Sequence, residues 1–186
     1  MLIIWDYFGV TAQDAFWYTA VRIAEGKGSS ELMDELHHKV DLGKITWDEY
    51  CQAVSSDIGV PYNEVVDRYQ QHNIKQNTIM AIKHLPEYKH VLLSNASHTY
   101  LLPIMDRLGL NNLFERVFVS SEIGFAKPDK RAFSFVLEQM EIEAGQAIMV
   151  DDSAHNIEAA RSMGIEGIVF DPSIDIFKEI KHLVAE

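Results

Sequence analysis

The sequence has little cysteine, few basic residues and no long apolar run, and each shortage argues against a class of protein. Cys51 is the single cysteine, so no disulfide can form within the chain, and we expect a buried thiol in a reducing compartment. No apolar run approaches the roughly 20 residues that a membrane-spanning helix requires. Because Asp6 interrupts the first apolar run, the N-terminal stretch does not resemble a signal peptide. We therefore expect a cytoplasmic protein that does not bind membranes.

Basic residues are also outnumbered, with 16 Lys and Arg against 28 Asp and Glu and a net charge of −12. Nucleic acid is not an expected partner, because surfaces that bind it are basic. A phosphorylated substrate remains compatible with this balance, since a metal ion and one or two local cations can invert the field at a site. The 186 residues, 47% of them hydrophobic, suffice for one core with a small insertion. The oligomeric state stays open.

The most informative segment of the sequence is residues 147–153, where four apolar residues are followed directly by Asp151 and Asp152. The apolar run predicts a strand that is buried on both faces. Ser153 favours the start of a helix immediately afterwards, and Gly164 favours its end. The two carboxylates therefore lie where a buried strand ends and a helix begins, which is where ligands bind in open α/β sheets. A divalent cation there would offset their mutual repulsion.

Strands and helices are predicted to alternate over most of the chain. Further strands are predicted at residues 2–5, 90–93, 117–119 and 168–170. This alternation predicts an α/β fold in three layers, with a central parallel sheet and helices on both of its faces. From residue 14 to 83 the apolar spacing is helical, no strand is predicted, and Thr46 has the spacing of a capping box with Glu49. We expect a core of residues 1–13 and 84–186 with a small helical domain, residues 14–83, inserted into it.

Polar residues follow four of the predicted strands or the loops beside them: Asp6, Ser94 with Asn95, Lys127, and Asp151 with Asp152. Because the carboxyl ends of parallel strands share one edge of a sheet, we expect these side chains to converge. The group suits phosphoryl transfer, with Asp6 as the nucleophile that attacks phosphorus. Mg²⁺ held by Asp6 and Asp152 would bridge nucleophile and phosphate, and Asp151 would orient the waters of the ion.

The remaining polar residues are candidate phosphate contacts. Ser94, together with the backbone amides near it at the start of a helix, would bind phosphate oxygens, and Asn95 belongs to the same segment. Lys127 would neutralise the charge that develops during the reaction and is therefore both a catalytic and a phosphate-binding candidate. Asn156 is expected to brace the loop after Asp152 rather than to contact substrate.

With these motifs the chain resembles the haloacid dehalogenase (HAD) superfamily over essentially its whole length. The resemblance rests on residues 5–11, 92–95, 124–129 and 150–164, and the last two segments are the closest matches. It implies a Rossmann-like core, Mg²⁺, an aspartyl nucleophile at Asp6 and a metal bond from the backbone carbonyl of Phe8. The helical insertion is similar to the C1 cap of the family, and residues 43–46 resemble a segment found in sugar-phosphate phosphatases. A Mg²⁺-dependent phosphatase acting on a small phosphorylated metabolite is the implied function.

Phe8 departs from the family pattern. Phosphatases of the family usually carry a second Asp two residues after the nucleophile, where it acts as general acid and base. A phenyl ring cannot transfer a proton, and general acid–base help is typically worth ~10²–10⁴-fold. Either another group or water takes this role, or turnover is slow, or the substrate has a good leaving group.

Two other interpretations remain open. One is a HAD fold that serves as a binding or regulatory protein with weak or no turnover. The other is a dehalogenase-like hydrolase that attacks carbon, because that branch also has an aromatic residue at the position of Phe8. Dehalogenases use no metal and lack the paired acids, so Asp151 and Asp152 favour a metal-dependent enzyme. In the insertion, Arg22, His37 and His72 are further candidates whose helical spacing does not show whether they face a substrate.

Overall fold

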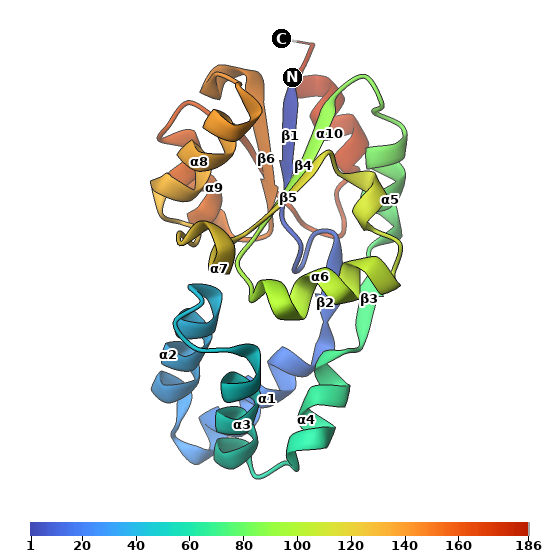
Figure 1. Cartoon of the computed structure of the whole chain (residues 1–186). Helices are drawn as coiled ribbons and strands as arrows, with labels where there is room; N and C mark the ends of the chain where they lie inside the picture. The colour runs from blue at the N-terminus through green and yellow to red at the C-terminus, as the bar shows by residue number, and fades with distance from the viewer. Residues whose placement is uncertain (186) are drawn as a thin grey trace.

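A five-stranded parallel sheet forms the centre of the protein, and the computed structural model describes it within residues 1–185 (Figure 1). Residue 186, the last of the predicted core, lies outside the described residues. The strand order is β5-β4-β1-β6-β7. The strands are β1 (Leu2–Trp5), β4 (Lys89–Ser94), β5 (Arg116–Val119), β6 (Ala147–Asp151) and β7 (Glu166–Val169). The predicted α/β fold with a central parallel sheet is confirmed.

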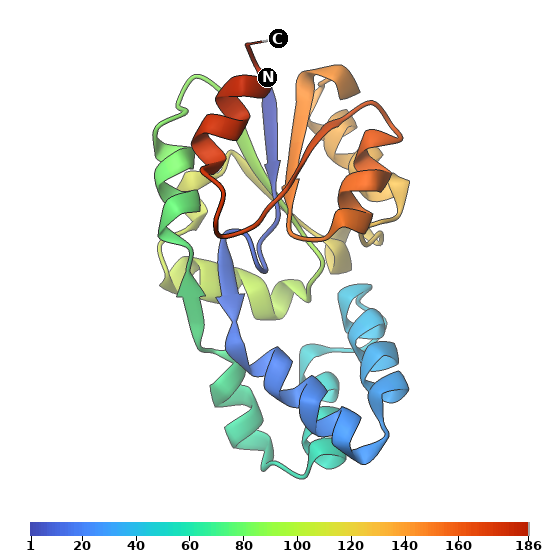
Figure 2. The same ribbon diagram turned by 180° about the vertical axis from the view of Figure 1, so that it is seen from behind.

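Helices cover both faces of this sheet, because successive side chains of a strand point to opposite faces. Ile3 and Trp5 pack toward one layer of helices, whereas Leu2 and Ile4 pack toward the other. The first layer contains α5 (Gln76–Lys83), α6 (His98–Arg107) and α10 (Ile176–Leu183); the second contains α8 (Lys130–Met140) and α9 (Ala154–Arg161). Shorter helical segments are η1 (Asn111–Leu113), α7 (Ser120–Ile123) and η2 (Ala144–Gln146). Figure 2 shows the same three layers from behind.

Four helices form a separate cap beyond one edge of the sheet (Figure 1). They are α1 (Ala15–Lys27), α2 (Ser30–Asp41), α3 (Trp47–Ile58) and α4 (Tyr62–Tyr69). Phe16, Ala20 and Ala24 repeat at helical spacing and are buried in a cap core that also contains Cys51, so the prediction of a buried thiol is confirmed. The capping box of α3 is present, since Thr46 and Glu49 bond each other's backbone amides. No helix in the described chain has the length and apolar character needed to cross a bilayer.

Two short antiparallel strands connect the cap to the core, and this differs from the prediction that residues 14–83 contain no strand. They are β2 (Ala12–Asp14) and β3 (His72–Ile74). The pairing was not predictable from local pattern, because three residues are too few to show a period of two and the partner lies about 60 residues away. The hydroxyl of Tyr7, just after β1, lies 3.0 Å from Nδ1 of His72 and ties this connection to the core.

The C-terminal part of the predicted insertion also differs. Helix α5 lies within residues 14–83, yet Ile79 and Ile82 are buried in the same cluster as Ile176 and Ile180 of α10. The helix therefore covers the central sheet instead of joining the cap. An amphipathic pattern shows that a helix has one buried face, but it does not show which neighbour covers that face.

Candidate active site

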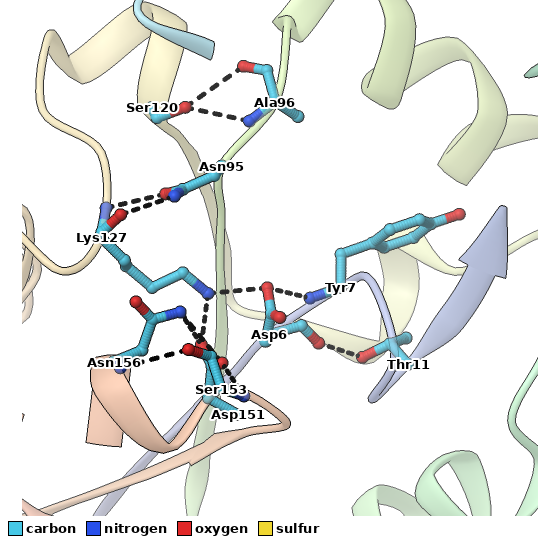
Figure 3. Close-up of polar contacts among 10 residues, drawn as sticks. All are labelled: Asp6, Tyr7, Thr11, Asn95, Ala96, Ser120, Lys127, Asp151, Ser153 and Asn156. Carbon is cyan, nitrogen blue, oxygen red and sulfur yellow. Dashed lines mark hydrogen bonds and ion pairs between the residues drawn. The ribbon is translucent and has the colours of Figure 1, made fainter. Parts of the chain in front are cut away.

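Several side chains meet at the carboxyl ends of the parallel strands, which form the edge of the sheet that faces the cap (Figure 3). Asp6 follows β1, Asn95 follows β4, and Asp151 is the last residue of β6. Lys127 reaches them from the loop between α7 and α8. The predicted convergence of these residues at one edge is therefore observed, and it follows from the parallel order of β4, β1 and β6.

Lys127 lies at the centre of this group. Its Nζ is 2.7 Å from Oδ1 of Asp6 and 2.6 Å from Oδ2 of Asp151, and the lysine is only 5% exposed. Burial alone would lower the pKa of Lys127, but the charges of Asp151 and Asp6 outweigh it and raise the pKa above its usual value. The ammonium group is thus charged and fixed between the predicted nucleophile and a second carboxylate.

Asn95 holds the backbone of Lys127 in place. The Asn95 side chain donates a hydrogen bond of 2.7 Å to the Lys127 carbonyl and accepts one of 2.8 Å from the Lys127 amide. Both ends of the Asn95 side-chain amide are therefore engaged in bracing the lysine loop. A role for Asn95 in binding phosphate stays a prediction.

Asp6 is held from two sides. Its Oδ1 accepts a hydrogen bond of 2.7 Å from the amide of Tyr7, and its backbone carbonyl accepts one of 2.7 Å from the hydroxyl of Thr11. Burial raises the pKa of Asp6 well above its ordinary value of 3.8, with Lys127 opposing the shift and Asp151 adding to it. A cation at this edge would favour the ionised form, which is the form that a nucleophile requires.

Asp151 is fully buried, and protein groups surround its carboxylate. It accepts hydrogen bonds from the Ser153 amide at 2.9 Å and from Nδ2 of Asn156 at 3.0 and 3.1 Å, in addition to Lys127. Asn156 therefore braces the loop, as expected. Because its oxygens are already engaged, Asp151 fits the predicted part of orienting the waters of an ion better than that of a direct ligand.

The geometry at Asp6, Asp151 and Asp152 fits a divalent cation. One oxygen from each carboxylate lies within 4.8 Å of the others. Asp152 is exposed and approaches Gly9 so closely that a Cβ on Gly9 would lie 2.1 Å from Oδ2 of Asp152. Gly9 also has a φ of +78°, which disfavours any other residue. Carboxylate and carbonyl oxygens are the ligands that Mg²⁺ prefers, so the residues present fit this ion.

A cavity of about 310 Å³ lies between this edge and the cap. It is lined by Asp6, Phe8, Gly9, Gln13, Asp14, Trp17, Tyr18, His37, Val40, Asp41, Trp47, Tyr50, Tyr69, Asn95, Ala96, Ser97, Tyr100, Lys127, Asp152 and Asn156. Of the three further candidates in the insertion, only His37 is among them. His72 bonds Tyr7 in the connection to the cap, and Arg22 is exposed on α1.

Ser94 differs from the other predicted site residues. It is fully buried at the end of β4, does not line the cavity, and its hydroxyl has no hydrogen-bond partner within residues 1–185. A buried polar group without a partner is costly, so this hydroxyl is free to bond a ligand group that approaches the strand end. Its predicted contact with phosphate stays a prediction.

Sequence reasoning missed most of the cavity wall, including Asp14, Asp41, Trp47 and Tyr100. Helical spacing shows that a side chain has neighbours one turn away, but not whether its face meets a cavity. One signal was readable at Asp41. A carboxylate in the last turn of a predicted helix lies at the negative end of the helix dipole, where it is unfavourable unless something offsets it.

Comparisons with known proteins give phosphatases and HAD-fold enzymes. The chain is 26% identical over 162 residues to the sesquiterpene phosphatase astK of Aspergillus oryzae, covering 82% of this chain and 81% of the relative. It is 35% identical over 83 residues to a ribulose-1,5-bisphosphate 5-phosphatase of Halopiger xanaduensis, covering 44% of this chain and 35% of the relative.

Among solved structures, the HAD family enzyme bt-2542 of Bacteroides thetaiotaomicron has a TM-score of 0.78 at 20% identity. The alignment covers 96% of this chain and 97% of that enzyme. The same enzyme has also been crystallised with magnesium and inorganic phosphate. A family model described as haloacid dehalogenase-like hydrolase matches residues 1–164, which include every polar residue predicted for the site. The family match and the shared fold agree with the motifs, and the chain belongs to the haloacid dehalogenase-like hydrolases.

Proposed function

We propose that the protein is a Mg²⁺-dependent phosphatase that hydrolyses a small phosphorylated metabolite through an aspartyl-phosphate at Asp6. The observation that carries the proposal is the group at the sheet edge. One carboxylate oxygen from each of Asp6, Asp151 and Asp152 lies within 4.8 Å of the others, and the buried ammonium of Lys127 bridges the first two residues. Three carboxylates against one lysine leave an excess of negative charge, which a divalent cation would offset.

Each residue has a defined part in this proposal. Asp6 attacks phosphorus, and the Tyr7 amide and Lys127 fix the orientation of its carboxylate. Asp6, Asp152 and the backbone carbonyl of Phe8 would hold Mg²⁺, with Asp151 orienting its waters. The ion would supply Lewis-acid stabilisation of the phosphoryl oxygens. Lys127 stabilises the charge that develops on those oxygens, and the Ser94 hydroxyl bonds one of them.

Asp151 and Asp152 also favour a phosphatase over an enzyme that cleaves carbon–halogen bonds. The fold resembles the L-2-haloacid dehalogenase of Xanthobacter autotrophicus, with a TM-score of 0.67 at 16% identity, which is a likeness of fold alone. A carboxylate such as Asp152, which forms no salt bridge within the described chain, is better explained by a bound cation than by a metal-free displacement at carbon.

The substrate class is also supported by the relatives. Both of the curated relatives described above are named as phosphatases, and one of them spans nearly the whole chain. Their named substrates differ from each other, so together they support a phosphate ester as substrate but no particular alcohol part. The cavity of about 310 Å³ favours a small alcohol part beside the phosphate.

A screen of phosphorylated metabolites with and without Mg²⁺ tests the proposal. We expect phosphate release from at least one small monoester, dependent on Mg²⁺ and lost in the Asp6→Asn variant. Tight binding of Mg²⁺ and phosphate without turnover across the panel would instead support a binding or regulatory protein. Halide release from a 2-haloacid without metal would support the dehalogenase-like alternative.

A further inference from the structure

A phosphatase built on this site lacks an evident proton donor for the leaving group. Phe8 cannot supply the proton, and its ring stacks on Tyr100 at a centroid distance of 6.4 Å. Asp14, an acid in the connection to the cap, already has hydrogen bonds to both of its carboxylate oxygens. Oδ1 accepts one from the Phe16 amide at 2.7 Å, and Oδ2 accepts one from the Tyr100 hydroxyl at 3.3 Å. The His72 ring is engaged through both nitrogens, and burial lowers its pKa to about 4.

Asp41 is different, because no hydrogen bond to its carboxyl group is found among the described residues. It is 7% exposed and lines the same cavity as Asp6 and Lys127. Nε2 of His37 lies 3.8 Å from Oδ2 of Asp41, which exceeds hydrogen-bond distance. Asp41 is also the last residue of α2, where the negative end of the helix dipole disfavours a carboxylate. A group kept in such an unfavourable place is a candidate for function.

The end of α2 is held against the catalytic edge of the core. The Ser120 hydroxyl donates a hydrogen bond of 2.5 Å to the backbone carbonyl of Asp41 and accepts one of 2.9 Å from the Ala96 amide. Ala96 follows Asn95, which braces Lys127 (Figure 3). These hydrogen bonds, joined through the peptide link between Ala96 and Asn95, fix the backbone of Asp41 relative to the loop of Lys127.

The direction in which the pKa of Asp41 is shifted agrees with a proton donor. Burial raises its pKa above the ordinary value, while His37, His38 and Lys127 oppose the shift. Tyr50, from α3, also lies close enough to interact with it, and burial raises the pKa of Tyr50 well above its ordinary value. A protonated Asp41 carries no charge and does not repel a phosphate bound at Lys127.

We propose that Asp41, in the cap, is the general acid and base that replaces the usual acid at the position of Phe8. This proposal rests on the phosphatase function proposed above. As a carboxylate oxygen of Asp6 bonds to phosphorus and the bond from phosphorus to the leaving oxygen breaks, Asp41 gives its proton to that oxygen and the alcohol departs. The Asp41 carboxylate then takes a proton from water, and the hydroxide oxygen bonds to phosphorus. The bond between phosphorus and Asp6 breaks, which releases inorganic phosphate and restores both acids.

The test compares three esters of similar shape: p-nitrophenyl, phenyl and benzyl phosphate. Their leaving groups need progressively more help from an acid, because p-nitrophenol is more acidic than phenol and phenol more acidic than benzyl alcohol. For Asp41→Asn we expect kcat/KM to fall ~10²–10⁴-fold on benzyl phosphate. On p-nitrophenyl phosphate the loss should be less than about tenfold, because that leaving group departs without a proton.

Asp34→Asn is the matched control, because it makes the same substitution at an exposed position on the same helix and should leave all three rates unchanged. Thermal melting checks that each variant is folded. Phe8→Asp placed in the Asp41→Asn background should restore part of the benzyl phosphate activity, which a merely structural role of Asp41 would not explain. Equal losses on all three esters, or no loss on any, would overturn the assignment to Asp41. Absence of Mg²⁺-dependent hydrolysis of all three esters by the unmodified protein would instead overturn the proposed phosphatase function.

Discussion

At the scale of single residues, the site is defined by an imbalance of charge. Lys127 contacts Asp6 and Asp151, whereas Asp152 has no salt bridge among residues 1–185. Burial is the first cause of the raised pKa of both Asp6 and Asp152, and the neighbouring Asp151 adds to it. An arrangement of this kind costs stability when it is empty and is favourable when a cation binds.

Replacing the nucleophile is the first prediction at this scale. Asp6→Asn should lower phosphatase turnover by several orders of magnitude, as loss of a nucleophile does in other enzymes. The fold should persist, because Asn keeps an oxygen that can accept from the Tyr7 amide and removes a carboxylate that burial disfavours. Steady-state hydrolysis and thermal melting of the purified variant measure both effects. Hydrolysis by this variant at the parent rate would show that Asp6 is not the nucleophile.

Gly9 gives a second prediction, on metal binding. In Gly9→Ala the new Cβ would lie 2.1 Å from Oδ2 of Asp152, so this carboxylate must move. Mg²⁺ affinity, measured by calorimetry, should fall roughly ten- to a hundredfold, the range found when groups that orient metal ligands are lost.

Gly26→Ala is its control, because Gly26 lies within α1 and a Cβ added there would meet no atom of the described chain within 4 Å. That variant should keep its Mg²⁺ affinity and gain about 0.5–1 kcal/mol of stability from the higher helix propensity of Ala. If Gly9→Ala bound Mg²⁺ as tightly as the parent does, Asp152 would not be a ligand.

The residues at strand ends were predictable and those of the cap wall were not. Asp6, Asp151 and Asp152 each follow an apolar strand, so the rule for parallel sheets placed them together without coordinates. Asp41 gains its significance from a cavity and from Ser120, which lies 79 residues away, and neither is visible in local spacing. The bracing role of Asn95 was missed for the same reason, because it depends on the path of a distant loop.

At the scale of elements, Asp14 links the connection between the domains to the start of α1. It caps this helix through the Phe16 amide, and burial raises its pKa to about 6. Because the native state then binds more protons than the unfolded state between about pH 4 and pH 6, this group makes the free energy of unfolding fall as the pH rises through that window.

The corresponding prediction concerns Asp14→Asn, which keeps the capping oxygen and does not titrate. Its free energy of unfolding relative to the parent should increase from pH 4 to pH 7, by at most about 3 kcal/mol. Urea denaturation of both proteins at several pH values measures the difference. A difference that stays constant with pH would show that the Asp14 carboxyl titrates normally.

Most elements were predictable, and the exceptions have a common cause. The capping box at Thr46 and the buried strands carry their signals within a few residues. Strand β3 and the placement of α5 depend on partners far along the chain: β2 for the strand, and α10 for the helix. Local pattern identifies an amphipathic segment, whereas the partner that it packs against is decided by the whole fold.

At the scale of the whole molecule, α6 joins the cap to the core. Tyr100 and Ile104 are buried with the cap helices, while Leu101 and Met105 are buried against the central sheet. The cavity is therefore bounded by both domains, and the chemistry at the sheet edge is shared with side chains of the cap. This arrangement is what allows a residue such as Asp41 to act on a substrate that the core binds.

The proposal that Asp6 and Asp152 hold a catalytic Mg²⁺ is tested most directly by the metal dependence of p-nitrophenyl phosphate hydrolysis by the unmodified protein. The rate should fall to background when EDTA removes divalent cations, and it should return when excess Mg²⁺ is added to the same sample. This result is predicted because three carboxylates and one lysine leave the site short of positive charge. Hydrolysis that continues unchanged in EDTA would contradict the claim that Asp6 and Asp152 hold a catalytic Mg²⁺.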